Sequence, residues 1–463
     1  MATNEIVGGS FRDPSGFVFR RDGVVYRQVN QRYVPALEQL ESSGLYRALV
    51  DADLLVRHER VDVAPPGNGS PPANILRPTQ IPFISYPYEW CFSQLKDAAL
   101  TTLEIQSTAL EYGMSLKDAS AFNIQFLDGR PVLIDTLSFE SYDEGRPWVA
   151  YRQFCEHFLA PLLLMCQVDP WLGRLPALTA DGIPLDIASK LLQRTSWLRP
   201  AALLHVHLHA RSIRRYGGRS VPRRLEARGL SRTGMKNLIE GLVHTIRGLD
   251  WSPEGTEWAE YAGEHGYADE AMTAKRRIVG ELLAAMAPRV AWDLGANTGE
   301  FSRIALDAGA HVVSMDFDPA AVERSYRRMR ERRESGLHPL WVDLRNPSPD
   351  LGWAGVERDS LSARSTADVV LALALVHHLA IGANIPLDRM LDWLATLAPN
   401  IVIEFVPKED PQAQRLLVSR DDVFDAYSRQ TFEAGLRRRF ELRATEELPG
   451  SDRVIYHGVR RAR

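Results

Sequence analysis

The sequence predicts an α/β protein whose C-terminal half is a doubly wound parallel sheet and whose N-terminal half is a separate α+β domain. From Val290 onward, apolar strand-like segments alternate with helical patterns, and several of the strands end in an acid. A turn of small residues follows the first of these strands. The 463 residues, 45% hydrophobic and 25% charged, are enough for two or three domains.

The turn after the first C-terminal strand is the most informative segment, Val290-Ala-Trp-Asp-Leu-Gly-Ala-Asn-Thr-Gly-Glu300. Gly295 and Gly299 lack a Cβ, so the backbone can turn tightly and approach a ligand, and Asn297 tolerates left-handed dihedral angles. The dinucleotide pattern Gly-x-Gly-x-x-Gly would need glycine at Asn297 and Glu300. Because the Glu300 carboxylate would repel a diphosphate, we expect a different nucleotide-type ligand.

Read as acid-x-Gly-x-x-x-Gly, this segment resembles the first motif of class I S-adenosylmethionine (AdoMet)-dependent methyltransferases, with Asn in place of the middle glycine. The resemblance implies a Rossmann-like sheet and AdoMet as the cofactor. It also implies cofactor contacts from this turn, at Asp293, Gly295, Ala296, Asn297 and Gly299.

The next strands end in residues that the same resemblance assigns to the cofactor. After the strand Ala310 to Met315, Asp316 takes the ribose role and Phe317 flanks the adenine. A short strand from Pro339 to Val342 ends in Asp343 and Leu344, which the family places at the adenine amino group and ring. Asp318 and Pro319 are instead typical of a helix cap, before a helix from Ala320 to Arg333.

The buried strand Asp368 to Val376 should face the methyl donor at its carboxyl end, with Ala372 as its cofactor contact. His377 and His378 follow at once, and either is a candidate base because imidazole titrates near neutral pH. Their alternative role is capping and packing, since adjacent side chains point in different directions and both cannot face the substrate.

Glu404, at the end of a strand from Asn400 to Pro407, is the second candidate base or a hydrogen-bond partner for the substrate; its alternative is a solvated loop acid. The stretch Glu404-Phe-Val-Pro-Lys-Glu-Asp-Pro-Gln-Ala-Gln-Arg-Leu-Leu resembles a bacterial methyltransferase subgroup that includes nodulation-associated members.

The N-terminal half contains a second pattern between Ser115 and Asp135, an Asp-x4-Asn loop, an Asp-Gly hairpin and an apolar strand ending in Asp. It resembles the aminoglycoside-phosphotransferase version of the kinase-like fold, with two lobes. That resemblance implies Asp118 as the base and Asn123 with Asp135 as magnesium ligands.

Several features depart from that family. There is no clear glycine-rich phosphate loop, and the strand expected at Asp53 to His58 lacks the usual lysine, which Arg57 would replace. Without a phosphate-gripping cation, we expect a degenerate kinase-like domain. The alternative is that Asp118 and Asp135 are ordinary turn and strand-end acids.

The predicted domains are a kinase-like domain at 1–225, a helical connector and leader at 226–285, and a methyltransferase domain at 286–463. In the leader, Tyr261 and Tyr267 are candidates for covering the sulfonium or the substrate, and Lys275 is expected on a helix surface. Packing is the alternative role of both tyrosines.

No metal site is expected in the methyltransferase half or at His205, His207 and His209. Alternate imidazoles would suit zinc on a strand, but their surroundings indicate a helix, on which His207 points away from the other two. Cys91, Cys155 and Cys166 form no CxxC pair and are expected as reduced thiols.

The charge pattern limits the partners. With a net charge of -4, the chain has no general attraction for nucleic acid, although Arg211 to Lys236 is rich in arginine and contains a single acid, Glu226. The favoured interpretation of this stretch is a solvated linker face that also docks on an acidic neighbouring surface. The alternative is an arm that contacts RNA or phosphate. No apolar run of about eighteen residues and no signal-like start occur, so we expect a cytoplasmic protein without membrane contact. The oligomeric state is left open.

Together these features predict an AdoMet-dependent methyltransferase that acts on a small polar or sugar-containing acceptor at oxygen or nitrogen. Three alternatives remain: a bifunctional kinase-methyltransferase, a methyltransferase of RNA or protein, and a non-catalytic AdoMet-binding regulator.

Overall fold

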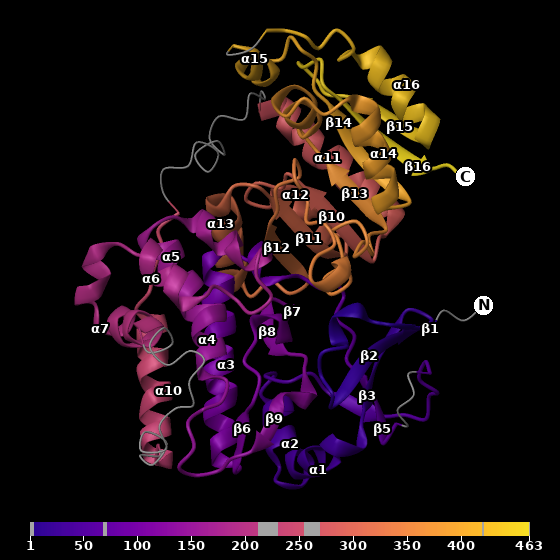
Figure 1. The fold of residues 1–463 in the computed structure, drawn as a ribbon. Coiled ribbons are helices and arrows are strands. Elements are labelled where there is room, and N and C mark those ends of the chain that lie inside the picture. Colours follow the sequence, from indigo (N-terminus) through magenta and orange to yellow (C-terminus); the bar gives the residue numbers. More distant parts are fainter. Residues whose placement is uncertain (1–3, 68–71, 212–229, 254–268, 419–420, 463) are drawn as a thin grey trace. The chain divides into compact units, whose positions relative to one another are not determined.

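The computed structural model describes residues 4–67, 72–211, 230–253, 269–418 and 421–462. The chain forms two compact units (Figure 1). The first unit is Met1–Ser252 together with Asp350–Arg358, and the second is Pro253–Pro349 together with Asp359–Arg463. Each unit has its own buried core.

The division falls near residue 252, later in the chain than the 225/226 boundary predicted from the sequence. The reason is α10 (Arg232–Arg247), which was assigned to the connector but packs beside α3 (Phe92–Glu111) in the first unit. Lys96 of α3 donates to the carbonyls of Arg247 and Leu249, at 3.0 and 2.6 Å.

The segment Asp350–Arg358 also belongs to the first unit, although it lies within the sequence of the C-terminal half. Trp353 packs against the ring of Phe11, with ring centroids 5.9 Å apart, and the Arg358 guanidinium lies over the ring of Phe122. Such long-range contacts leave no periodic signal in the sequence.

The second unit contains a seven-stranded sheet in the order β12-β11-β10-β13-β14-β16-β15. Its strands are β10 (Val290–Leu294), β11 (His311–Asp316), β12 (Leu337–Trp341), β13 (Val369–Ala372), β14 (Asn400–Phe405), β15 (Phe440–Glu447) and β16 (Val454–Arg460). The first five strands in this order are parallel, and β16 and β15 are antiparallel additions at one edge. The predicted doubly wound sheet is confirmed.

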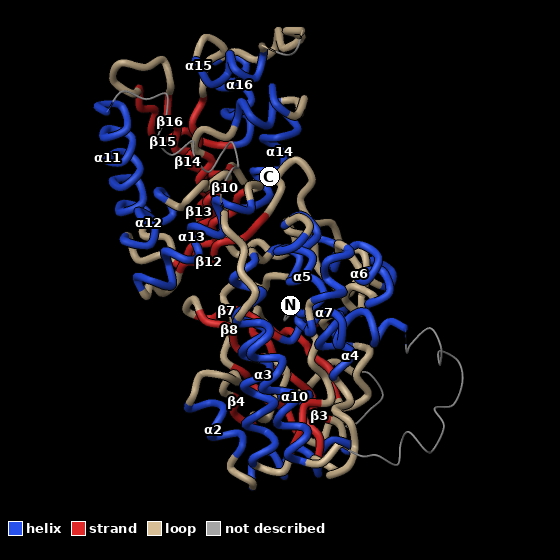
Figure 2. The backbone as a smooth tube through the Cα atoms, turned by 90° about the vertical axis from the view of Figure 1, so that its left-hand side faces the viewer, coloured by secondary structure: helices blue, strands red, loops and turns tan. Residues whose placement is uncertain are grey.

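Helices cover both faces of this sheet, as a mostly parallel sheet requires. They are α11 (Asp269–Met286), α12 (Glu300–Asp307), α13 (Pro319–Arg332), α14 (Leu387–Leu397), α15 (Pro411–Leu417) and α16 (Arg429–Arg439). Figure 2 shows α11, α12 and α13 on one side of the strands and α14 and α16 on the other. All four residues of β13 are buried, as expected for a strand covered on both faces.

The strand order places a switch point between β10 and β13. From β10 the chain proceeds outward through β11 and β12, and then returns to the other side of β10 to form β13. In open α/β sheets, ligands bind in the crevice at the carboxyl ends of the strands at such a point. The predicted cofactor turn follows β10 and therefore lies at this crevice.

The first unit combines a five-stranded antiparallel sheet, in the order β1-β2-β3-β5-β4, with a larger helical part, the hairpin β7-β8 and the antiparallel pair β6-β9. The sheet strands are β1 (Asn4–Ile6), β2 (Gly16–Arg21), β3 (Val24–Val29), β4 (His58–Arg60) and β5 (Asn74–Pro78). The strands of these two pairs are β6 (Met114–Leu116), β7 (Ile124–Leu127), β8 (Arg130–Leu133) and β9 (Phe139–Ser141). Among its described residues, the α-helices besides α3 and α10 are α1 (Val34–Ser42), α2 (Leu45–Asp51), α4 (Tyr151–Phe154), α5 (Ala160–Gln167), α6 (Leu185–Leu191) and α7 (Pro200–Ala202).

Two local predictions for this unit have different outcomes. The Asp-Gly hairpin is confirmed, because Asp128 and Gly129 join β7 to β8 with φ of 50° and 74°, as a two-residue turn with both central residues left-handed requires. The strand expected at Asp53 to His58 is wrong, since β4 begins only at His58 and Leu55 makes an isolated bridge to Leu133.

Among the described residues, no helix has the length and apolar character needed to cross a membrane. Cys91, Cys155 and Cys166 are all free thiols, as the sequence predicts.

Candidate functional site

The turn after β10 has the backbone conformation predicted from its residue types. Gly295, Asn297 and Gly299 adopt φ of 74°, 50° and 79°, all in the left-handed region. The amides of Gly295 and Ala296 both donate to the carbonyl of Met315, at 2.9 and 3.0 Å, which fastens the turn to the neighbouring strand β11. A Cβ on Gly295 would lie 3.2 Å from Leu375 Cδ1, so a larger residue would crowd this end of the crevice.

Two buried carboxylates stand at the ends of β10 and β11. Asp293 accepts a hydrogen bond from the hydroxyl of Ser302 at 2.6 Å. Asp316 accepts from the amides of Asn297 at 2.8 Å and Asp318 at 2.9 Å. Burial raises the pKa of both carboxyls to about 6. Because a carboxylate has about four acceptor positions, Asp316 can still accept hydrogen bonds from ligand hydroxyls.

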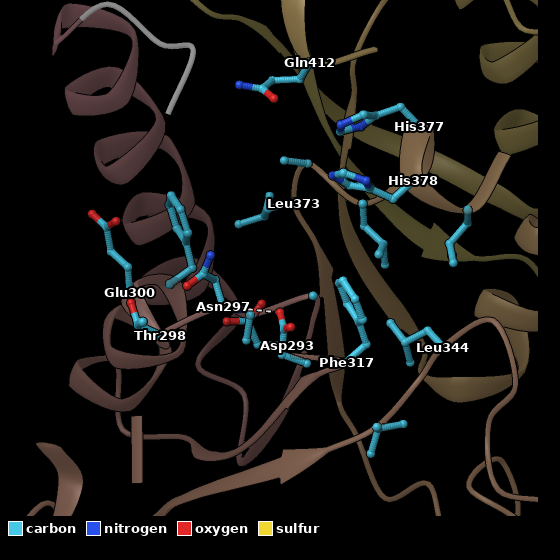
Figure 3. A pocket seen from close by; sticks show the side chains of 18 of the residues that line it. Asp293, Asn297, Thr298, Glu300, Phe317, Leu344, Leu373, His377, His378 and Gln412 are labelled. Carbon is cyan, nitrogen blue, oxygen red and sulfur yellow. Dashed lines mark hydrogen bonds between the residues drawn. The ribbon is translucent and has the colours of Figure 1, made fainter. Parts of the chain in front are cut away.

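These residues line a cavity of about 800 Å³ in the second unit (Figure 3). This volume lies within the usual range for small-molecule sites. The lining includes most of the predicted cofactor residues, namely Asp293, Gly295, Ala296, Asn297, Asp316, Phe317, Asp343 and Leu344.

Gly299 and Ala372 are predicted cofactor residues that do not line the cavity. Gly299 is the N-cap of α12 and has the left-handed backbone conformation that the sequence predicts, but it forms no part of the cavity wall. Ala372 is fully buried inside β13, so the lining residues at this strand end are Leu373, Ala374 and Leu375. The predicted contact was placed too early in the strand.

Asp343 has a partner that the sequence analysis missed. The guanidinium of Arg345 pairs with both of its oxygens at 2.9 Å and also lies 5.3 Å from the centroid of the Phe317 ring. Arg345 thus connects the two residues expected around an adenine, and any adenine amino group must share the Asp343 carboxylate with it. The only feature of the sequence that could have indicated the role of Arg345 is its position two residues after Asp343.

Comparison with known proteins supplies the family. The chain is 37% identical over 460 residues to nodulation protein NoeA of Rhizobium meliloti (strain 1021), covering 97% of this chain and 95% of that protein. The chain belongs to the NoeA family. No family model matches it.

Several solved structures resemble part of this NoeA-family chain. PH0226 of Pyrococcus horikoshii OT3 matches at 16% identity and a TM-score of 0.32, over 42% of this chain and 93% of that one. The N-methyltransferase NodS of Bradyrhizobium japonicum WM9, in complex with S-adenosyl-L-homocysteine, matches at 11% identity and a TM-score of 0.32, over 45% and 100%. The bifunctional kinase-methyltransferase WbdD matches at 18% identity and a TM-score of 0.31, over 45% and 43%. At these levels of similarity, they do not establish a shared function.

Both adjacent histidines of the NoeA-family chain line the cavity, contrary to the expectation that only one could face it. His377 is the N-cap of a short π-helix, η12 (His378–Gly382), and the two imidazoles pack with centroids 4.1 Å apart. Figure 3 shows both rings on the same side of the cavity, with Asn297 and Asp293 across from them. The local π-helical geometry overrides the side-chain directions expected of a strand or α-helix.

Both imidazoles are neutral near pH 7. Burial lowers the pKa of His378 to about 4 and that of His377 well below its ordinary value, and nearby cations lower both further. His377 is 1% exposed, and neither of its ring nitrogens has a hydrogen-bond partner among the described residues. His377 is therefore a better candidate than His378 for a hydrogen bond to a bound molecule.

Glu404 does not line the cavity, and its predicted role as a base is not supported. It is fully buried rather than a solvated loop acid. One carboxylate oxygen accepts from Lys275 at 2.7 Å and from the amide of Ala374 at 2.8 Å. Lys275 is 2% exposed, so its expected place on a helix surface is also wrong. The two residues are 129 positions apart, and no local pattern connects them.

The three residues of the kinase-like pattern come together in the first unit. Asn123 donates to the hydroxyl of Ser138 at 3.3 Å, and Ser138 in turn donates to the carboxylate of Asp135. Burial raises the pKa of Asp118, and the neighbouring Asp135 raises it further. The three residues therefore lie close together, and the roles that the resemblance implies for them stay predictions.

The cation of this cluster was misidentified. Arg57 is exposed and lies 3.9 Å from the equally exposed Asp51. Arg27, on β3, instead pairs with Asp135 at 2.7 Å, and both side chains are largely buried. The cation of Arg27 therefore closes directly on the acid that the resemblance assigns to magnesium.

Two further predictions concern other parts of the chain. The helical interpretation of His205, His207 and His209 is confirmed by the π-helix η9 (Leu203–Leu208), and the imidazole of His207 is bound by Ser189 and Ser196 at 2.7 and 2.8 Å. Most of the basic stretch Arg211 to Lys236, with Tyr261 and Tyr267, lies outside the described residues. Within the described ranges, no cluster of His, Cys, Asp and Glu could hold a metal ion.

Proposed function

We propose that this NoeA-family chain is an AdoMet-dependent methyltransferase. One observation carries the proposal: the turn residues Gly295 to Thr298 and the carboxylate of Asp316 lie at adjacent strand ends of a doubly wound sheet and line the same cavity. This combination fits a ligand with a ribose, an adenine and a compact cationic end.

The residues of the cavity fit such a ligand without rearrangement of the turn. Asp316 has acceptor capacity left for ribose hydroxyls, and Phe317 with Leu344 offers apolar surface to an adenine ring. The crowding that a Cβ on Gly295 would cause indicates a turn shaped for close backbone approach. When bound, AdoMet supplies an activated methyl group, and the protein's task is to orient the acceptor and to take up its proton where it carries one.

The opposite side of the cavity suits a polar acceptor. His377, His378 and Gln412 lie on this side, and Leu379 and Leu416 also line the cavity. We propose a small polar or sugar-containing acceptor, methylated at oxygen or nitrogen, with His377 accepting the hydrogen bond of the reacting group. The name of the Rhizobium meliloti relative connects that protein with nodulation and names no substrate.

Isothermal titration calorimetry with AdoMet and its product S-adenosylhomocysteine (AdoHcy) tests the cofactor. We expect micromolar binding of both to the wild-type chain and a loss of binding in Asp316→Ala. Absence of binding by a correctly folded wild-type protein would contradict the proposal. Binding without turnover in any cell extract would favour a regulator.

For the first unit we propose a supporting role without phosphate transfer. The observation behind this is that the Asp135 carboxylate is already engaged by Arg27 and Ser138. The test is calorimetry with magnesium-ATP. We expect no affinity. Phosphate transfer from ATP that is lost in Asp135→Ala would establish the bifunctional alternative instead.

A further inference from the structure

The turn that follows β13 contains a strained residue facing the cavity. Ala374 has a φ of 50°, in the left-handed region that residues with a Cβ rarely adopt. Ala374 and its neighbours Leu373 and Leu375 all line the cavity. Strained backbone of this kind persists only where the surrounding structure holds it, and it occurs preferentially at functional sites.

Glu404 is the group that holds this turn. Its Oε2 accepts the amide hydrogen of Ala374 at 2.8 Å and, at the same time, pairs with Lys275 Nζ at 2.7 Å. The second oxygen lies 3.8 Å from the guanidinium of Arg453. Glu404, Lys275 and Arg453 are each no more than 2% exposed. One buried carboxylate therefore connects α11, the end of β13 and the residue that precedes β16.

The partners of Glu404 are fixed in turn. Lys275 lies 4.8 Å from the centroid of the Phe301 ring, and Arg453 binds Asp410 with two hydrogen bonds of 2.6 and 2.8 Å. Removing such charges from water is costly, and buried ion pairs are often replaced by apolar residues without loss of stability. Stability alone is therefore a weak explanation for this pair, and a defined geometry at the cavity is a stronger one.

The turn leads directly to the histidines. The carbonyl of Leu375 accepts from the amides of His378 at 3.0 Å and Leu379 at 3.2 Å, which starts the π-helix that carries both imidazoles into the cavity. The conformation of Ala374 thus sets where that helix begins and where His377 lies.

We propose that Glu404 and Lys275 are positioning residues for methyl transfer, acting by holding the Ala374 turn in its left-handed conformation and thereby fixing His377. This inference rests on the proposed function. It assigns no contact between Glu404 and the substrate, and it predicts that relaxing the turn itself removes the need for Glu404.

A rescue experiment tests the proposal. Glu404→Met removes the acceptor and the charge, Glu404→Gln keeps an acceptor for the Ala374 amide, and Ala374→Gly allows the turn to adopt a positive φ without strain. Turnover of methyl-labelled AdoMet is measured with the low-molecular-mass fraction of a cell extract as the acceptor. Glu404→Met should lower kcat at least tenfold, with less than a threefold change in the KM for AdoMet.

The double variant Glu404→Met/Ala374→Gly should recover most of the lost kcat, and Glu404→Gln should lose less than Glu404→Met. Ala287→Gly is the matched control, because Ala287 is also left-handed, with a φ of 44°, but is exposed and does not line the cavity. Combined with Glu404→Met, Ala287→Gly should not restore the lost kcat. Lys275→Met should resemble Glu404→Met and should also be rescued by Ala374→Gly.

Unchanged kcat in a folded Glu404→Met variant would overturn the proposal, as would equal rescue by Ala287→Gly and Ala374→Gly. If the wild-type chain neither binds AdoHcy nor transfers label, the proposed function fails instead. In that case the melting temperatures of the same variants still report whether Glu404 and Ala374 are coupled: coupling upholds the link between them, and additive effects refute it.

Discussion

Replacement of Asp316 by Asn should weaken AdoHcy binding in a way that depends on pH. In the structure the Asp316 carboxylate receives two backbone amides and faces the cavity, and burial raises its pKa to about 6. Asparagine has nearly the same shape but no charge and one acceptor oxygen fewer.

The expected size follows from these contacts. Hydrogen bonds to a charged acceptor contribute about 1.5–3 kcal/mol, so a loss of about 2 kcal/mol at pH 8 corresponds to about a thirtyfold weaker affinity. Hydroxyl donors bind the ionised carboxylate, which the free protein holds fully only above its pKa of about 6. Lowering the pH to 5 protonates Asp316 in the free wild-type protein and weakens binding by about tenfold at this site. Asp316→Asn has no carboxyl group to protonate at this position, so its affinity for AdoHcy should be only about threefold below that of the wild type at pH 5.

Calorimetric titration of AdoHcy into both proteins between pH 5 and pH 8 measures the ratio of their dissociation constants. Asp318→Asn is the matched control, because asparagine is an equally good helix cap and Asp318 does not line the cavity. It should bind AdoHcy as the wild type does at pH 8. Since the Asp318 charge raises the pKa of Asp316, the control should also move the titration to lower pH. A ratio between Asp316→Asn and wild type that is independent of pH would refute the reasoning.

Three further predictions follow from other parts of the molecule. Gly295→Ala forces a Cβ to within 3.2 Å of Leu375 Cδ1 at a φ of 74°, so the calorimetric affinity for AdoHcy should fall more than tenfold; unchanged affinity would show that no ligand approaches this backbone. Arg27→Met leaves the buried Asp135 without its cation and should lower the free energy of unfolding of the first unit in urea by about 3 kcal/mol, with AdoHcy affinity retained. Arg57→Met should change neither the unfolding free energy nor the AdoHcy affinity. Equal effects of the two variants would contradict the assignment of Arg27 as the cation that pairs with Asp135. His157 is 3% exposed, and burial lowers its pKa to about 4, below the unfolded value of about 6.5. Its contribution to stability is therefore complete above pH 6.5 and is lost as the pH falls toward 4, by about 2 kcal/mol at pH 5. His157→Leu should flatten the unfolding free energy over this range, and an unchanged slope would argue against a neutral buried imidazole.

The features that the sequence predicted correctly are those encoded within a few consecutive residues. The left-handed turn at Gly295, Asn297 and Gly299 depends on residues without a Cβ or with a short amide side chain, and the parallel sheet depends on apolar segments separated by helices. The Asp128-Gly129 hairpin is equally local.

The features that the sequence did not predict depend on residues far apart in the chain. Lys275 meets Glu404 across 129 positions, and Arg27 reaches Asp135 from another strand. In both cases the partner comes from a distant part of the chain, so no local pattern indicates the pair. The paired orientation of His377 and His378 also required the structure, because a π-helix has no recognisable residue pattern here.

Transfer of a labelled methyl group tests the central claim most directly. Purified wild-type protein, incubated with methyl-labelled AdoMet and a low-molecular-mass cell extract, should release AdoHcy and place the label on a polar molecule identifiable by mass spectrometry. Asp316→Ala should do neither under the same conditions. If the wild-type chain binds AdoMet but labels nothing above the Asp316→Ala background, the protein is not a methyltransferase of such a molecule.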